Sequence, residues 1–359
     1  EGAREHYKTA REVHQSEQKK RIGGDKGIFL TDEDLQQVAV RMELIDKGPG
    51  KLKSMLEKAE HDGSLADKVR IGMAIASEFA RANEKRKAEK WLMKTADTIV
   101  ELPAEKRAGF HFQAGVIYNK LNDMEEAERS TREGLKTVSA DDSGMQGSLN
   151  KLLGQIHFRK GNYGKGEEKF NRAKMFFRRT DSIFQQADSM LWEVKSILAR
   201  SGILTKAMTI SFLDRERSSR KTRSAIDDCI TRIREALLIL GGSTRKTGAL
   251  SRLLGREIFD ERNVSLWRQL LVLRGSLEWL GAYTEFAAET AGDIILLGKK
   301  TRKTDIVLEG SIIKARILSQ MKRKKEARSI LEELMSKKTI PDGPKRNALS
   351  YTLRLIKKK

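Results

Sequence analysis

Residues 147–180 read GSLNKLLGQIHFRKGNYGKGEEKFNRAKMFFRRT, and this stretch decides the fold. Apolar side chains recur three and four positions apart in its first half, and the same spacing returns after Gly161-Asn162. One face is marked by Leu152, Leu153, Ile156 and His157, and the next by Phe170, Ala173, Phe176 and Phe177. Such spacing is typical of a helix with one buried face, and Gly-Asn is typical of a short turn. The stretch therefore predicts two antiparallel helices joined by a tight connection.

Outward from this stretch, a small residue recurs every 38 to 41 positions along the chain. The series is Gly50, Ala88, Ala127, Gly166, Ala207, Gly248, Ala287 and Ala327. Another small residue lies twelve positions before several of these, as at Ala76, Gly115, Gly154 and Ala315. Two packed helices need small side chains where their backbones approach most closely. One helix pair cannot bury its apolar face alone, so the period predicts an all-α chain of stacked pairs.

Four stretches resemble tetratricopeptide repeats, a family of helix pairs with a unit of about 34 residues. In residues 147–180 the matching positions are Leu153-Gly154, His157, Gly161-Asn162-Tyr163, Gly166, Phe170 and Ala173. In residues 108–141 they are Ala114-Gly115, Tyr118 and Ala127. Weaker matches cover 188–221, through Val194, Leu198, Gly202 and Ala207, and 308–341, through Leu318, Ala327 and Leu331. The chain departs from the family in its longer period, near 40, and in lacking the family's proline at the end of each unit.

The resemblance implies a right-handed α-solenoid of about seven to eight stacked antiparallel helix pairs. We expect the solenoid to cover residues 31–338, with the best repeats at 66–100, 104–138, 145–179, 183–217 and 303–337. Residues 1–30 are predicted to form an N-terminal helix or arm with a Gly-rich hinge. Residues 343–359 are predicted to form a C-terminal capping helix with a basic tail.

The formal net charge of +21 is distributed unevenly along the chain. Residues 1–150 carry 26 Lys and Arg against 27 Asp and Glu, whereas residues 151–359 carry 45 against 23. An excess confined to one part of a chain indicates an acidic partner, such as nucleic acid, an anionic membrane surface or an acidic protein face. The alternative is a basic surface that serves solubility alone.

The residues that carry chemistry are sparse, which argues against an enzyme. Five His residues lack Cys or carboxylate partners at metal-ligand spacing, and neither a phosphate-binding loop nor a nucleophile elbow is present. We therefore expect no catalytic residue, no cofactor and no metal. The single cysteine, Cys229, lies among Ile226, Ile230 and Ile233 at helical spacing, so we expect a small core residue. One cysteine and no apolar run of about 18 residues favour a cytoplasmic, reducing location without a membrane span.

Two surfaces are candidates for binding. In the resembled family the first helix of each pair lines a concave groove, which implies groove residues Lys151, Gln155, Phe158, Arg159, Trp192 and Arg200. Trp192 is open to a second interpretation, as a packing residue between repeats. A basic patch is predicted where helices end, comprising Arg215, Arg217, Arg220, Lys221, Arg223, Lys322, Arg323, Lys324 and Lys325. Basic residues also stabilise helix C-termini, so these clusters have a structural alternative.

The sequence thus favours a non-enzymatic scaffold that binds a protein or peptide in its groove and docks an acidic partner through its basic second half. One alternative is a nucleic-acid- or ribosome-associated protein held by nonspecific phosphate contacts. Another is a regulatory domain that senses a peptide. The oligomeric state is left open.

Overall fold

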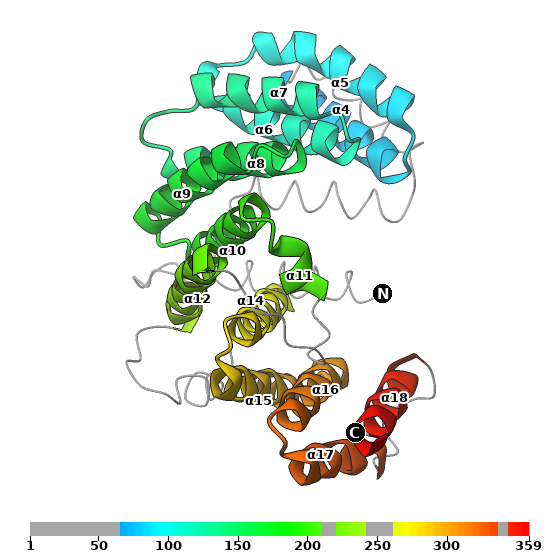
Figure 1. Cartoon of the computed structure of the whole chain (residues 1–359). Helices are drawn as coiled ribbons and strands as arrows, with labels where there is room; N and C mark the ends of the chain where they lie inside the picture. The colour runs from blue at the N-terminus through cyan, green and yellow to red at the C-terminus, as the bar shows by residue number, and fades with distance from the viewer. Residues whose placement is uncertain (1–64, 210–219, 242–260, 337–343, 359) are drawn as a thin grey trace, which may run out of the picture. The chain divides into compact units, whose positions relative to one another are not determined.

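The computed structural model describes residues 65–209, 220–241, 261–336 and 344–358 (Figure 1). Every regular element in these ranges is an α-helix, which confirms the all-α prediction. The chain divides into two compact units, Glu1–Asp141 and Asp142–Lys359. The segment predicted as an N-terminal arm, 1–30, lies outside the described residues, as do Gly50 and Gly248 of the small-residue series.

Within each unit, helices pack against their neighbours in the chain, as in an α-solenoid. Unit 1 contains α4 (Leu65–Arg81), α5 (Lys85–Val100), α6 (Ala104–Lys120) and α7 (Met124–Thr137). Unit 2 begins with α8 (Ser143–Arg159), α9 (Tyr163–Arg179), α10 (Ile183–Arg200), α11 (Leu204–Thr209) and α12 (Arg220–Gly241). It continues with α14 (Glu261–Leu280), α15 (Thr284–Lys300), α16 (Thr304–Gln320), α17 (Lys324–Ser336) and α18 (Pro344–Lys358).

A left-handed residue marks the turn inside each helix pair. These residues are Asn83, Asn122, Gly161, Gly202, Ala282 and Lys322, each with a positive φ. In every such turn the next backbone N–H donates to a carbonyl five residues earlier, as Asn162 does to His157 (2.8 Å). This bond satisfies a carbonyl at the end of the first helix and reverses the chain. Four of the six positions hold the Gly or Asn expected at a break, whereas Ala282 and Lys322 adopt the same conformation without that signal.

Small residues lie where the helices of a pair meet, as their period predicts. Ala88, Ala127, Gly166, Ala207, Ala287 and Ala327 are all buried. In the α8–α9 pair a Cβ added to Gly154 would lie 2.7 Å from the Phe170 ring, and one added to Gly147 would lie 2.8 Å from Phe177. A Cβ on Gly166 would lie 3.2 Å from the Gly154 carbonyl oxygen. Two large rings therefore pack onto two glycines, so that α8 and α9 approach closely.

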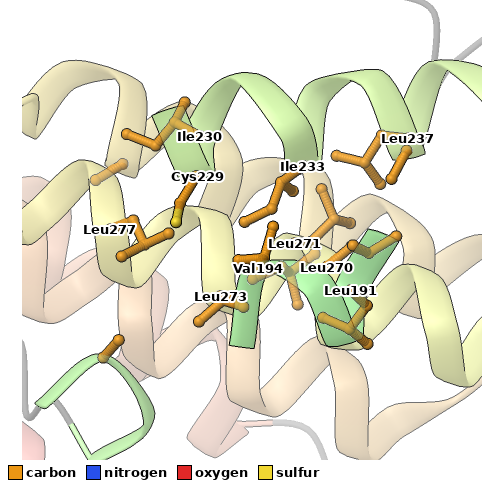
Figure 2. Packing of buried hydrophobic residues seen from close by; sticks show 14 of the residues in the cluster. Leu191, Val194, Cys229, Ile230, Ile233, Leu237, Leu270, Leu271, Leu273 and Leu277 are labelled. Carbon is orange, nitrogen blue, oxygen red and sulfur yellow. The ribbon is translucent and has the colours of Figure 1, made fainter. Parts of the chain in front are cut away.

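The structure describes the repeat predicted at 183–217 only as far as Thr209. Its second helix, α11, is described over Leu204–Thr209, and α12 packs against both α10 and α14. Figure 2 shows the core that these three helices share. Its labelled members are Leu191, Val194, Cys229, Ile230, Ile233, Leu237, Leu270, Leu271, Leu273 and Leu277. Cys229 is fully buried in this cluster, which confirms it as a core residue.

The last helix, α18, covers the end of unit 2. Leu349 and Ile356 are buried against α16 and α17, together with the side chain of Thr352. Its other side exposes Tyr351 and Arg354 to solvent. An apolar inner face with a largely polar outer face is the arrangement that a terminal helix of a repeat array requires.

Candidate interaction surfaces

Two of the predicted groove cations have acidic partners within the chain. The Lys151 ammonium on α8 pairs with the Asp188 carboxylate on α10. The Arg200 guanidinium lies 3.1 Å from a carboxylate oxygen of Glu167. Both cations are therefore already neutralised locally. Gln155 is half-buried on α8, and Arg159 is exposed at the end of that helix.

The aromatic groove residues pack against one another. The Trp192 ring stacks on Phe170 with 5.8 Å between centroids, and it meets the edge of Phe158 at 5.5 Å. Phe158 also contacts the Tyr163 ring, and the Lys195 ammonium lies 4.7 Å above the Trp192 centroid. Trp192 on α10 thus bridges α8 and α9, which is the packing role that the sequence left open.

Polar contacts link the first helices of successive pairs in unit 2, a feature that sequence reasoning missed. The links are Lys151 to Asp188, Lys195 to Gln269 (3.4 Å), Arg268 to Glu309 (2.6 Å) and Arg316 to Thr352 (3.1 Å). Three of these pairs are 36 to 41 residues apart, close to the period. Two of them, Lys151–Asp188 and Arg268–Glu309, join opposite charges about one period apart, and such charge pairs were the available signal. The basic side chains in these links lie on the helices that were expected to line the groove, and they are already bound to partners within the chain.

The predicted basic patch is only partly visible. Arg215 and Arg217 lie outside the described residues, and Arg220 and Lys221 are described only as backbone in the first turn of α12. The exposed Arg223 donates from Nη2 to the Gly281 carbonyl oxygen (3.2 Å) and lies over the Tyr283 ring.

The second half of the patch lies in the turn between α16 and α17 and at the start of α17. It consists of Lys322, Arg323, Lys324 and Lys325. Arg323 pairs with Glu326 (2.7 Å) and lies 3.7 Å from Glu285. Arg223 and Arg323 therefore contact the same short segment, residues 281–285, although they lie 100 residues apart in the sequence.

A hollow of about 430 Å³ lies among α15, α16 and α17. It is lined by Glu285, Ala288, Glu289, Lys314, Leu318, Arg323, Glu326, Ser329 and Ile330. Its rim mixes three carboxylates with two cations, and Arg323 engages two of those carboxylates itself.

Two buried glutamates join helices in the interior of unit 2. Glu193 on α10 accepts from Arg232 of α12 (2.6 Å) and Lys174 of α9 (3.4 Å). Burial raises the pKa of Glu193, while those two cations act in the opposite direction. Glu278 on α14 accepts from Arg274 and Thr290, each at 2.7 Å. These networks tie helices together.

Cys229 and His157 are buried, and His111 is half-buried. Burial raises the pKa of the Cys229 thiol to about 12, which suppresses its thiolate. Burial lowers the pKa of His111, and His157 is buried on α8.

No cluster of three His, Cys, Asp or Glu suited to a metal occurs in the described ranges. The helices described are also too short or too polar to cross a membrane.

Comparison with known proteins leaves the family open. No family model matches the chain. No curated protein matches it either. Among solved structures, the crystal structure of BtubC (BKLC) from P. vanneervenii aligns at 15% identity with a TM-score of 0.45, covering 88% of this chain and 97% of that one. At this level of similarity we assign no family, ligand or partner from the alignment.

Proposed function

We propose that this chain is a non-enzymatic, tetratricopeptide-like scaffold whose second unit docks an acidic partner protein. One observation carries the proposal: the whole net charge belongs to one structural unit. Residues 1–141 hold 26 basic and 26 acidic residues, whereas residues 142–359 hold 45 and 24. A solubility charge has no reason to follow a unit boundary, whereas a docking surface does.

The distribution of partners within unit 2 supports the same conclusion. Three cations on α9 have no ion-pair partner among the described residues, namely Lys165, Arg178 and Arg179. In contrast, Lys151 and Arg200 of the expected groove are paired within the chain. The unpaired cations attract an acidic surface without first breaking an internal bond. The groove of Lys151, Gln155, Phe158, Arg159, Trp192 and Arg200 stays a prediction for a peptide ligand.

A second candidate function is nonspecific binding to nucleic acid. The favouring observation is that Arg223 and Arg323, which are far apart in the sequence, both contact residues 281–285. Cations aligned along an edge can follow a phosphate backbone. Against this candidate, Arg323 is engaged by Glu285 and Glu326, which would compete with phosphate.

Fluorescence anisotropy across a salt series separates the two candidates. The probes are labelled poly-L-glutamate of about 20 residues and a labelled 30-nucleotide RNA. Docking of an acidic protein predicts saturable binding of the polypeptide that weakens with salt and at least equals RNA binding at about 150 mM salt. Tight RNA binding, with a salt slope that indicates several phosphate contacts and negligible polypeptide binding, supports the second candidate and contradicts the first.

A further inference from the structure

We infer that the outer face of α9 is the docking surface, and that its partner is an acidic protein segment carrying an apolar side chain. This inference rests on the proposed function. The surface, called the α9 stripe below, consists of Lys165, Glu168, Arg172, Met175 and Arg179. All five residues are exposed, and their spacing of three and four places them on one face of the helix. At 1.5 Å per residue the stripe extends about 21 Å, the length of a four-turn partner helix.

The charge of the α9 stripe is uncompensated. It carries three cations and one carboxylate, and the carboxylate of Glu168 is held by Arg172 at 2.9 Å. Lys169, beside the stripe, lies 3.6 Å from the same carboxylate. Arg179 lies over the Phe176 ring at 5.4 Å, which orients its guanidinium without neutralising it. Lys165, Arg179 and the neighbouring Arg178 therefore present free positive charge to a partner.

The equivalent stripe in unit 1 shows that the fold does not require these charges. Shifted by 39 residues, the positions of Lys165, Glu168, Arg172 and Met175 become Glu126, Arg129, Glu133 and Lys136 on α7. There Arg129 pairs with Glu126, and Lys136 pairs with Glu133 at 2.7 Å. The α7 stripe is thus neutral and internally paired. The same backbone positions in α9 carry Lys and Arg where α7 carries Glu, so the helix pair itself does not dictate these charges.

The composition of the stripe distinguishes a protein from nucleic acid. The Met175 side chain is 56% exposed near the middle of the basic face. A thioether offers an adaptable apolar contact to a partner side chain and little to a phosphate backbone. The stripe therefore fits Asp and Glu flanking an apolar residue.

The test compares charge reversal on the stripe with matched reversal elsewhere in unit 2. The first variant is Lys165→Glu/Arg172→Glu/Arg179→Glu. The control is Lys299→Glu/Lys300→Glu/Arg302→Glu, which changes three exposed cations and gives the same net charge. The probes are a labelled 18-residue helical peptide of Glu with Leu at every third or fourth position, poly-L-glutamate and the 30-nucleotide RNA. Circular dichroism of each variant establishes that helix content and melting temperature are retained.

We expect the stripe variant to bind the Glu/Leu peptide about thirtyfold more weakly, and the control less than about threefold more weakly. Met175→Ser should weaken binding of the Glu/Leu peptide and leave poly-L-glutamate unaffected. Equal losses of peptide affinity in the stripe variant and the control would show that the α9 stripe is not the docking surface. The proposed function would survive that result. If the unaltered chain binds RNA but neither polypeptide, both the proposed function and the inference about the α9 stripe fail.

Discussion

The helix pairs α6–α7 and α8–α9 share one backbone design and differ on both faces of their second helix. In register, Thr131 on α7 corresponds to Phe170 on α9, and both side chains are fully buried. On the outer face, Glu126 and Glu133 of α7 correspond to Lys165 and Arg172 of α9. Both glutamates form ion pairs with basic residues of α7 itself. The turn residues Asn122 and Gly161 and the small residues Ala127 and Gly166 are in contrast equivalent in role.

This difference separates the determinants of fold from those of binding. The small residues and the left-handed turns recur in both units and create the helix pair. The outer charges of α7 and α9 differ although the two helices share one register. α5 in unit 1 is a useful intermediate case, because it exposes Arg86 and Lys90 but also places Lys85 beside Glu89 and Asp123. A basic helix in a neutral unit therefore sits in a weaker field than α9.

The largest expected effect concerns the buried faces. Phe170→Ala removes a ring that packs on Gly154, and should lower the free energy of unfolding by about 3–5 kcal/mol. Thr131→Ala removes one hydrogen bond to the Ala127 carbonyl oxygen, and should cost about 1 kcal/mol. Urea titration followed by circular dichroism measures both. Equal losses would show that the two pairs are packed alike and would remove the contrast between their cores.

A smaller effect is expected from the ion pairs. Glu193→Ala leaves Arg232 and Lys174 without their shared partner at a buried junction, and should cost about 3 kcal/mol. The matched change on α7, Glu128→Ala, breaks a more exposed pair with Arg132 and should cost less than about 0.5 kcal/mol. The same urea titrations compare them. A loss at Glu193 no greater than that at Glu128 would mean that the buried network contributes nothing to unit 2.

The smallest expected effect transfers the surface from one unit to the other. Glu126→Lys/Glu133→Arg gives α7 the charges of α9, and we expect a two- to fivefold gain in binding of the Glu/Leu peptide, since exposed charge pairs contribute less than about 1 kcal/mol each. Anisotropy titration measures it. The control, Arg86→Glu/Lys90→Glu/Lys94→Glu on α5, should leave peptide binding nearly unchanged. A large loss in that control would place the docking surface in unit 1.

Much of the fold could be predicted from the sequence, because helix spacing and small-residue periods are local signals. The hairpins around Gly161 and Asn122 and the burial of Cys229 follow from such patterns. The packing of α12 against both α10 and α14 could not be predicted, since the periodic residue in this region, Ala207, lies on α11.

The candidate site was harder to predict than the fold. Counting charged residues placed the excess of positive charge in the second part of the chain. The clusters at Arg223 and Lys322 were recognisable as runs of basic residues. The pairing of Lys151 with Asp188 and of Arg200 with Glu167 depends on which helices become neighbours. The α9 stripe has a spaced charge pattern with no run of basic residues, and it becomes evident only when its exposure is set against the ion pairs of α7.

Site-specific photo-crosslinking tests the central claim most directly, because it compares the two stripes within one fold. Benzoylphenylalanine is placed at Met175 in one variant and at Lys136, the equivalent position on α7, in another. Each variant is irradiated with the Glu/Leu peptide at about 150 mM salt. The account predicts a strong adduct from position 175, lost on adding Lys165→Glu/Arg172→Glu, and little adduct from position 136. Comparable adducts from both positions would contradict it.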